Sequence, residues 1–452
     1  MQANTVKPAF KYNNLYILRI SFISALGGYL FGFDFAVISG ALPFLKTAFH
    51  LSSWWEGFLT GSLALGCIVG CLIAGKLADR YGRKPGLVVA AAIFAFSSLG
   101  MAFSPRLAEF IAMRFTAGIG VGMASMLSPL YIAEVSPAGV RGRNVAINQL
   151  TIVLGILITN LVNYLLAGKG PDIWRWMFGL GLIPSALFLF GVLFLPESPR
   201  WLVKAGKGEK AANILAKIGS PGFVGSTMGD IEKATHQAGK VSYSAVFAKG
   251  VRPAVMVGIT LAVFQQFCGS NVIFNYASTI FKSIGADVNK QLLEIVAIGV
   301  INGLFTLAAM WQVDKLGRRP LMLIGSLGLS LIYLVLAFLL REKAGIAWVS
   351  IVVLLAIGMY AISLAPVTWV IISEIFPNDI RGVATSVAVV CLWIAYFILV
   401  FTFPVLKDHI GIYGTFYLYA AICFLGFLFI RAKVKETKGQ TLEQLEQSFS
   451  AH

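Results

Sequence analysis

Charged residues are scarce in this chain. Asp, Glu, Lys and Arg together make up 12% of the 452 residues, whereas 58% are hydrophobic and the mean hydropathy is +0.81. A soluble chain carries about twice that share of charge. The composition therefore excludes an ordinary soluble enzyme and predicts a protein whose solvent is lipid.

Cysteine and histidine are also sparse, with five and four residues. The cysteines all fall inside apolar runs, which excludes a framework of disulfide bonds. Cys67 and Cys71 are four residues apart, but no His or acidic residue accompanies them, so we expect packing rather than metal binding. The sequence shows no phosphate-binding loop and no constellation of histidine, nucleophile and base within an apolar run. We expect no enzyme, no metal site and no cofactor.

Long apolar runs are abundant, and each is close to the roughly 17–25 residues that a membrane-spanning helix needs. Twelve are expected, at 14–44, 54–78, 86–103, 107–135, 144–167, 173–195, 250–282, 289–313, 320–341, 345–375, 381–404 and 411–432. No short apolar region with a cleavage site begins the chain, so we expect the first run to be a retained helix rather than a signal peptide.

The formal net charge of +16 is compatible with nucleic-acid binding, so the positions of the basic residues decide its meaning. Most of the 36 Lys and Arg residues fall on one side of the predicted spans, in alternate loops and in both ends of the chain. Only Arg19 and Arg114 lie within apolar runs, and Arg19 is near a span end. This positive-inside pattern predicts a multi-pass membrane protein with both termini cytoplasmic and no nucleic-acid partner.

The chain also repeats itself. Three motifs occur twice, in the same order and at nearly the same spacing: DRYGRKP (Asp79–Pro85) and DKLGRRP (Asp314–Pro320), EVSPAGVRG (Glu134–Gly142) and EIFPNDIRG (Glu374–Gly382), and Glu197 in PESPR with Glu436 in KETKG. They follow the second, fourth and sixth spans of each half, so both halves have the same orientation. We therefore expect an all-α integral membrane fold of 12 transmembrane helices in two six-helix halves.

The boundaries of the predicted spans divide the chain into four segments: a six-helix half at 1–195, a linker at 196–249, a second six-helix half at 250–432 and a tail at 433–452. The linker is polar and has two weakly amphipathic stretches, so we expect a cytoplasmic segment with short helices. A disordered tether is the alternative.

The repeated loop motifs combine carboxylates with guanidiniums, which pair with helix ends and with each other. Pairs such as Asp79 with Arg83, and Asp314 with Arg318, could hold the halves closed on the cytoplasmic side and break when that gate opens. Membrane anchoring by the basic residues alone is the alternative. The expected gate residues are Asp79, Arg83, Glu134, Arg141, Glu197, Arg200, Asp314, Arg318, Glu374 and Arg381.

GKLADRYGRKPG at Gly75–Gly86 resembles the signature loop of the major facilitator superfamily. PESPR at Pro196–Arg200, the two E-x-x-P-x-x-x-R-G loops and ETKG at Glu436–Gly439 resemble the sugar porter family within it. The chain is similar to bacterial proton-coupled monosaccharide symporters of the xylose type and, more distantly, to mammalian facilitative glucose transporters. This resemblance implies a secondary transporter of the cell (inner) membrane that alternates access between its halves.

Polar side chains are few within the spans, and each is a functional candidate because an unpartnered polar group is costly in hydrocarbon. Gln265, Gln266 and Asn271 form QQxxGxN in the seventh span, and Asn275 shares a helical face with Asn271. Side-chain amides donate and accept hydrogen bonds, as sugar hydroxyls do. We predict that these residues bind sugar, with hydrogen bonding between helices as the alternative.

The resemblance implies further sugar contacts at Gln149, Asn302 and Trp369. It also implies that Phe31 and Trp393 are aromatic residues of the sugar cavity, with packing as the alternative role. Aromatic rings would stack on the C–H face of a pyranose while amides satisfy its hydroxyls.

Three positions depart from the family pattern. Asn275 replaces the first of two tyrosines, Ala365 replaces a glycine, and Leu392 replaces an amide residue. One amide is lost and another is gained, so the set of sugar hydroxyls that the site reads is altered. The resemblance implies a pentose or hexose such as xylose, glucose, galactose or arabinose.

Asp34 lies in the first span, where an ionised carboxylate costs about 2.5–3.5 kcal/mol on insertion scales. Arg114 in the fourth span is the other deep charge of that half, so we expect an Asp34–Arg114 pair. Separating the two would switch the proton affinity of Asp34 and couple a proton to sugar movement. The resemblance agrees, because proton-coupled members carry Asp at this place and facilitative ones carry Asn. A static ion pair in a uniporter is the alternative.

The sequence thus predicts import of a monosaccharide by proton symport. A proton-independent facilitative uniporter stays open, as does a membrane sugar sensor that does not transport, although the short tail argues against a sensor. The expected partners are a monosaccharide, a proton and the lipid bilayer, and the chain is expected to be monomeric.

Overall fold

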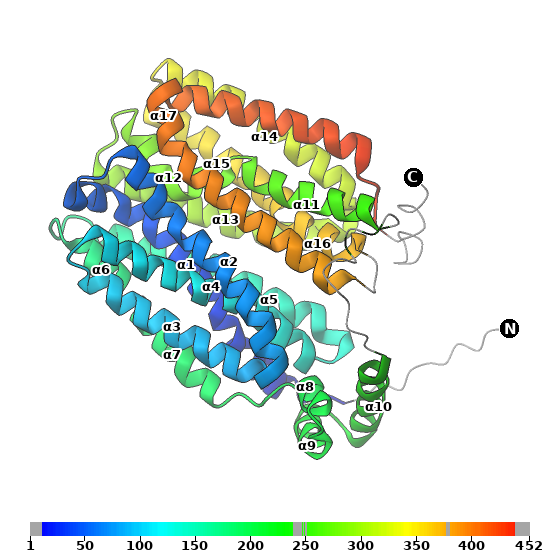
Figure 1. Cartoon of the computed structure of the whole chain (residues 1–452). Coiled ribbons are helices and arrows are strands. Elements are labelled where there is room, and N and C mark those ends of the chain that lie inside the picture. Colours follow the sequence, from blue (N-terminus) through cyan, green and yellow to red (C-terminus); the bar gives the residue numbers. More distant parts are fainter. Residues whose placement is uncertain (1–10, 238–245, 247, 249–250, 377–379, 439–452) are drawn as a thin grey trace.

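A computed structural model describes residues 11–237, 246, 248, 251–376 and 380–438 (Figure 1). Of the predicted tail, only 433–438 belong to this part. Every regular element among the described residues is a helix, and one isolated antiparallel bridge joins Tyr12 to Gly219.

The first half consists of helices that match its six predicted spans. They are α1 (Asn14–Phe49), α2 (Ser53–Tyr81), α3 (Arg83–Phe103), α4 (Leu107–Val135), α5 (Ala138–Leu166) and the pair α6 (Ile173–Gly179) and α7 (Leu182–Leu193). Their ends follow local capping rules. Asn13 accepts a hydrogen bond from the Tyr16 N–H (3.1 Å) and begins α1, while Ser52 accepts one from the Trp55 N–H (3.5 Å) and begins α2.

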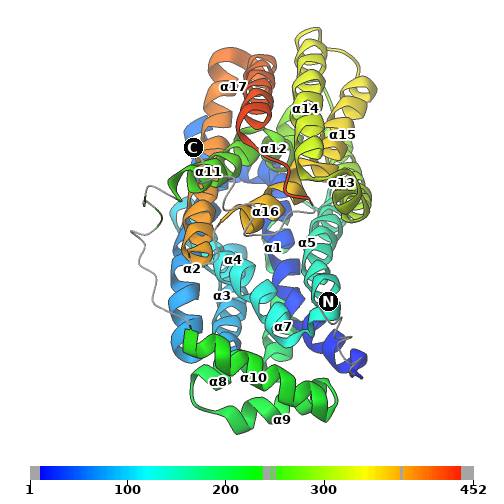
Figure 2. The same cartoon turned by 90° about the vertical axis from the view of Figure 1, so that its right-hand side faces the viewer.

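Three short helices follow the first half: α8 (Pro199–Lys204), α9 (Gly208–Ile218) and α10 (Pro221–Gln237). Figure 2 shows them side by side at one end of the first half. The chain before α1 is attached to them, because the Asn13 N–H donates to the Ile218 carbonyl (2.9 Å) and the Tyr12 ring meets the Phe223 ring edge-on, 5.3 Å between centroids.

The second half contains α11 (Arg252–Phe267), α12 (Ser270–Lys282), α13 (Val288–Leu316), α14 (Arg318–Arg341), α15 (Ile346–Ile362), α16 (Leu364–Ile375) and α17 (Arg381–Lys433). α17 has 53 residues and a kink at Gly411 (φ 73°), so it holds two of the predicted spans. Within the described ranges, 11 helical stretches are long and apolar enough to cross a membrane, and α17 is the last of them.

Helices within a half pack through small residues. A Cβ on Gly66 of α2 would collide with the Phe115 carbonyl of α4, and a Cβ on Gly118 of α4 would collide with the Leu63 carbonyl of α2. Lipid supplies little hydrophobic drive for helix association, so such close backbone approach is a main source of packing energy.

Two spans of the second half are broken. α11 ends and α12 begins at Gly269, which has a φ of +86° and leaves no room for a Cβ beside Tyr419. α15 gives way to α16 at Ser363 (φ −122°, ψ −88°). The Gln265 amide joins the two spans, since it donates to the Ala365 carbonyl at 3.2 Å. Irregular backbone at membrane depth is tolerated where protein encloses it, as here.

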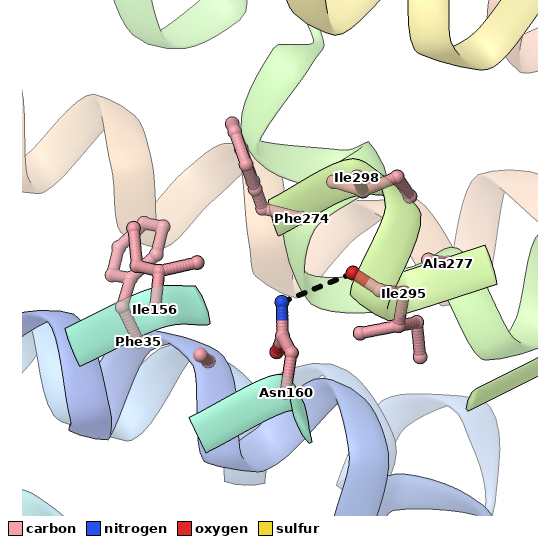
Figure 3. A pocket seen from close by; sticks show the side chains of 8 residues that line it. Phe35, Ile156, Asn160, Phe274, Ala277, Ile295 and Ile298 are labelled. Atoms are coloured by element: carbon pink, nitrogen blue, oxygen red, sulfur yellow. Dashed lines mark hydrogen bonds between the residues drawn. The ribbon is translucent and has the colours of Figure 1, made fainter. Parts of the chain in front are cut away.

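The two halves meet at the end of the molecule away from the repeated loop motifs. We call the end that carries Asp79–Pro85 and Glu134–Gly142 the motif end. At the opposite end, Gly57 of α2 is so close to α17 that a Cβ would collide with the Phe401 carbonyl. The Asn160 amide of α5 donates to the Ile295 carbonyl of α13 at 3.1 Å (Figure 3).

A small cavity of about 10 Å³ lies in this contact, lined by side chains of α1, α5, α12 and α13 (Figure 3). Its walls are mainly apolar, with Phe35 and Ile156 from the first half and Phe274 and Ile298 from the second. The volume is about that of a single water molecule, too small for a sugar. The opposite end is therefore sealed.

Candidate functional site

A continuous chain of amide hydrogen bonds runs along the break between α11 and α12. Gln266 Nε2 donates to Gln265 Oε1 (3.2 Å), and Asn271 Nδ2 donates to Gln266 Oε1 (2.5 Å). All three side chains are buried, at 3–6% exposed. The structure brings together the three amides of the QQxxGxN motif, and Gly269 lets the chain turn between them.

Asn275 continues this chain toward α17. Its Nδ2 donates to the Asn271 carbonyl (2.7 Å), and its Oδ1 accepts from the Tyr396 hydroxyl (3.1 Å). The residue is fully buried. In this conformation its side chain has protein partners on both sides, as the interhelical alternative expects, and direct sugar contact by Asn275 stays a prediction.

The aromatic residues Phe31 and Trp393 meet across the two halves. Their ring centroids are 6.0 Å apart, and each ring also contacts a second aromatic residue: Phe31 lies 5.8 Å from Phe35, and Trp393 lies 5.8 Å from Tyr396. Phe35 and Tyr396 close the group at 5.2 Å. These four rings from α1 and α17 form a wall beside the amides, and they support packing as well as stacking on a ligand.

Gln149 and Asn302 occupy the facing sides of α5 and α13. Gln149 is on the same helical stripe as Val153, Ile156 and Asn160, which approach the second half, but it lies closer to the motif end. It is exposed, and no described residue forms a hydrogen bond with it. Asn302 continues the corresponding stripe of α13 and is 7% exposed.

Trp369 lies in α16, six residues after the break at Ser363. Its ring is 45% exposed, whereas its neighbours Val367 and Thr368 are fully buried. The structure therefore leaves both Gln149 and Trp369 accessible, while it encloses the amides of α11 and α12.

Asp34 and Arg114 are both enclosed by the first half, at 2% and 0% exposed. The expected ion pair is not formed: no hydrogen bond or ion pair joins them, and Asp34 Oδ1 and the three guanidinium nitrogens are buried without hydrogen-bond partners. The guanidinium instead lies over the Phe178 ring, 5.9 Å from its centroid. Their charges still interact, because both lie in the same low-dielectric interior.

Other buried polar atoms of the described residues, such as the Ser21 and Ser128 hydroxyls, also lack a hydrogen-bond partner. Cys67 lies near both charges. Of the two groups, the Asp34 carboxyl can carry a proton, whereas the Arg114 guanidinium stays protonated and only donates hydrogen bonds.

At the motif end of the first half, a carboxylate network joins three loops. Arg83 pairs with Glu134 at 2.8 Å, and the Ser198 hydroxyl donates to the other Glu134 oxygen at 2.5 Å. Glu197 accepts from the backbone N–H groups of Arg83 (2.9 Å) and Lys84 (3.2 Å), at the start of α3. A carboxylate at a helix N-terminus is stabilised by the free N–H groups and by the helix dipole.

The second half repeats this network residue for residue. Arg318 pairs with Glu374 at 3.2 Å, and the Thr437 hydroxyl donates to the other Glu374 oxygen at 2.5 Å. Glu436 accepts from the backbone N–H groups of Arg318 and Arg319, both at 3.0 Å. Burial alone would raise the pKa of Glu436, but N–H groups at the start of α14 and in its own loop hold that pKa below its ordinary value.

The sequence did not single out Ser198 and Thr437. A signal was present, because a hydroxyl residue follows the glutamate in both PESPR and KETKG. The repeated hydroxyls bind the carboxylates Glu134 and Glu374, which are also repeated.

The expected partners within the loop motifs need correction. Arg83 binds Glu134 instead of Asp79, because Asp79 is exposed and faces α8, where it pairs with Lys204 at 3.2 Å. The side chain of Asp314 lies outside the described part of the chain. The described ion pairs of this set join residues of one half or, for Asp79 and Lys204, the first half to α8, so they do not hold the two halves to each other in this conformation.

The other expected gate residues lie outside these networks. Arg381 donates to the Phe376 carbonyl (3.1 Å). Arg141 is half-buried and Arg200 is exposed, and neither forms an ion pair with a described residue.

A family model for sugar (and other) transporters matches residues 20–449. The chain belongs to this family. It is 38% identical to the D-xylose-proton symporter of Escherichia coli (strain K12) over 96% of each chain. It is 41% identical to the glucose transport protein of Synechocystis sp. (strain ATCC 27184 / PCC 6803 / Kazusa), covering 96% of this chain and 97% of that relative.

Solved structures give the same result. The inward open conformation of the Escherichia coli xylose transporter superimposes with a TM-score of 0.86 at 36% identity, covering 96% of this chain and all of that one. The same symporter bound to 6-bromo-6-deoxy-D-glucose gives a TM-score of 0.81 at 38% identity, over 97% and 100% of the two chains.

These matches confirm the fold class predicted from the sequence, an all-α membrane protein with the major facilitator fold, and they confirm the sugar porter resemblance. The protein is a multi-pass membrane transporter and not an enzyme.

Proposed function

We propose that the protein imports a monosaccharide, a pentose or hexose such as D-xylose or D-glucose, by proton symport with alternating access. The observation that carries this proposal is the chain of side-chain amides at the break between α11 and α12, next to a wall of aromatic rings from both halves. Amides that both donate and accept match sugar hydroxyls, and aromatic faces match the C–H face of the ring.

The proposed sugar contacts are Gln265, Gln266, Asn271, Asn302, Gln149 and Trp369, with Phe31 and Trp393 as the aromatic wall. Gln149 and Trp369 are accessible, and the amides of α11 and α12 bind each other while no sugar is present. Sugar hydroxyls replace these amide contacts as the halves close around the substrate, so few polar groups remain unsatisfied at any stage.

Asp34 is the proposed proton carrier and Arg114 its partner. Their buried polar atoms lack hydrogen bonds in this conformation, so the carboxyl is a natural site for a proton. When the guanidinium approaches the carboxylate, the proton is released, because a nearby positive charge favours the ionised form. Alternation between these arrangements would couple one proton to each transport cycle.

The proposed orientation places both termini in the cytoplasm, with the motif end facing inward. The seal at Gly57 and Asn160 then closes the outer side, and the exposed Gln149 faces the inner side. The higher TM-score with the inward open relative than with the sugar-analogue complex supports this assignment.

The test is uptake of radiolabelled D-xylose, D-glucose, D-galactose and L-arabinose into proteoliposomes, with and without an inward proton gradient. Wild type and Asp34→Asn are compared side by side. We expect the gradient to drive accumulation in wild type, while the variant only equilibrates or exchanges sugar.

If uptake ignores the gradient and Asp34→Asn behaves as wild type, the protein is a facilitative uniporter and Asp34 is structural. If sugar binds but none of the four enters the vesicles, the protein is a sensor for these sugars and the transport proposal is wrong.

A further inference from the structure

The amide chain of the proposed sugar site does not end at Asn271. The Asn275 amide bonds to the Asn271 backbone carbonyl and to the Tyr396 hydroxyl, so hydrogen bonds and the Asn271 backbone together link Gln265 in α11 to α17. Both ends of the link are fully buried, with Asn275 at 0% and Tyr396 at 1% exposed. A buried polar network of this kind is stiff, because leaving any member unsatisfied is costly.

Tyr396 in turn lies against the proposed proton site. Its ring packs on Phe35, the residue that follows Asp34 in α1, with 5.2 Å between centroids. The charge of Arg114 acts on its hydroxyl. Tyr396 belongs to the second half and Phe35 to the first, so this ring contact lies between the halves, one residue along α1 from Asp34.

The backbone is irregular on both sides of the segment that contains Asn275. The next residue, Tyr276, has non-helical angles (φ −123°, ψ 20°), and Gly269 breaks the helix on the other side. The segment from Ser270 to Asn275 is therefore a short helical piece between two irregular points. A displacement of Asn271 by a ligand passes to Asn275 directly, because the Asn275 amide is bonded to the Asn271 carbonyl.

From these contacts we infer that Asn275 and Tyr396 form the link through which sugar occupancy controls the proton site, as positioning residues that do not themselves bind the sugar. This inference rests on the proposed symport. In this conformation the Tyr396 hydroxyl donates to Asn275, and its ring packs on Phe35, the neighbour of Asp34 in α1. When sugar displaces Asn271, Asn275 releases the Tyr396 hydroxyl, the packing of α17 on α1 changes, and the proton affinity of Asp34 changes with it.

Asn275 is also a position at which this chain departs from its family pattern, because the resemblance implies a tyrosine there. A tyrosine at 275 would donate and accept through one oxygen at the end of a long side chain, whereas asparagine has a separate donor and acceptor on a short one. The amide is suited to joining the Asn271 carbonyl to the Tyr396 hydroxyl at once.

The test removes the link without removing packing. Tyr396→Phe deletes one hydroxyl, and Asn275→Leu deletes the amide at nearly constant volume. Tyr276→Phe is the matched control, since Tyr276 is the adjacent buried residue of α12 and its hydroxyl also bonds to α17, at the Val400 carbonyl (2.8 Å). Proteoliposomes containing each variant are assayed with D-xylose, or with the sugar that the uptake panel selects in its place.

Two readouts separate coupling from transport. Sugar counterflow without a proton gradient measures exchange, and gradient-driven accumulation measures coupling. We expect Tyr396→Phe and Asn275→Leu to keep counterflow within about threefold of wild type. Gradient-driven accumulation should fall at least about fivefold, which is the lower end of usual coupling strengths. Tyr276→Phe should keep both. The double variant should lose no more than either single variant, because both break one link.

Equal accumulation in Tyr396→Phe and wild type would overturn the inference, as would additive losses in the double variant or an equal loss in Tyr276→Phe. If one single variant does not fold, the other still decides, since each breaks the link from its own side. Failure of the symport proposal is distinct, because then wild type itself shows no gradient-driven accumulation.

Discussion

Gly82 and Glu197 lie in direct contact at the motif end, where a Cβ on Gly82 would collide with the Glu197 carboxylate. Gly82 also has a φ of +107°, a backbone conformation that residues with a side chain rarely adopt. The same relationship recurs in the second half, where a Cβ on Gly317 (φ +91°) would lie 2.8 Å from Glu436. In each half the glycine lets the carboxylate reach the N-terminus of the next helix.

Gly82→Ala should therefore destabilise the protein. The positive φ costs about 1–3 kcal/mol for a residue with a side chain, and displacement of Glu197 adds the loss of its bonds to α3. Thermal unfolding of the detergent-solubilised protein measures the effect. Gly75→Ala is the control, because Gly75 is in α2 with no atom near its Cβ position, and this change should leave stability unchanged or slightly raised. Equal melting temperatures for Gly82→Ala and wild type would contradict the role given to the glycine.

Glu436 should make the second network sensitive to acid. Its pKa is lower in the folded protein than its ordinary value of 4.5, so the stabilisation is fully present above that value and is lost as the pH falls through the folded pKa. The backbone N–H groups of Arg318 and Arg319 report on this directly, because they donate to the carboxylate. Their hydrogen exchange, corrected for the intrinsic rates, should be constant above about pH 5 and accelerate below it.

The control for this experiment is Glu436→Gln, which cannot titrate. We expect weaker protection of both amides at neutral pH and no additional loss on acidification. A wild-type protein whose protection is the same at low and neutral pH would show that the carboxylate contributes nothing to the start of α14.

Gly57→Trp should prevent closure of the opposite end. A side chain at Gly57 meets the Phe401 carbonyl, so α2 and α17 cannot approach as they do here. Spin labels on cysteines introduced in the two halves at the end of the molecule that carries Gly57 should show longer distances in the variant than in wild type, measured by double electron–electron resonance. Gly75→Trp, near the motif end of α2 and with no atom close to its Cβ position, should leave those distances unchanged. Indistinguishable distance distributions for Gly57→Trp and wild type would show that this contact does not limit closure.

Much of this architecture was predictable from the sequence, because lipid imposes strong rules. Apolar length located the spans, and the motifs at Asp79 and Asp314 located the two halves. The amides of QQxxGxN could also be placed together, since they lie within seven residues of each other on one broken helix. These features depend on local sequence and on the environment.

Pairing between helices was less predictable. The sequence suggests Asp34 with Arg114 because both are deep charges, but it contains no information on the Phe178 ring that lies by the guanidinium. It suggests Asp79 with Arg83 because they are neighbours, whereas Glu134 is the actual partner. Such choices depend on side-chain direction and on the conformation of the transport cycle, which a linear pattern does not specify.

Gln149 and Gln265 offer a final test of which amides bind sugar and which hold the protein together. Gln265 is 3% exposed and joins α11 to α16, whereas Gln149 is exposed and forms no hydrogen bond with a described residue. Gln149→Ala should therefore weaken sugar binding without changing the melting temperature, and the loss of one hydrogen bond to a neutral ligand should cost about 0.5–1.5 kcal/mol, or roughly 2- to 13-fold in affinity. Gln265→Ala should lower both affinity and stability, because it leaves a buried carbonyl and Gln266 without a partner. Calorimetric titration with sugar and thermal unfolding of each variant separate the two effects. An unchanged affinity in Gln149→Ala would remove that residue from the proposed site and would show that this accessible side chain of α5 forms no hydrogen bond with the sugar.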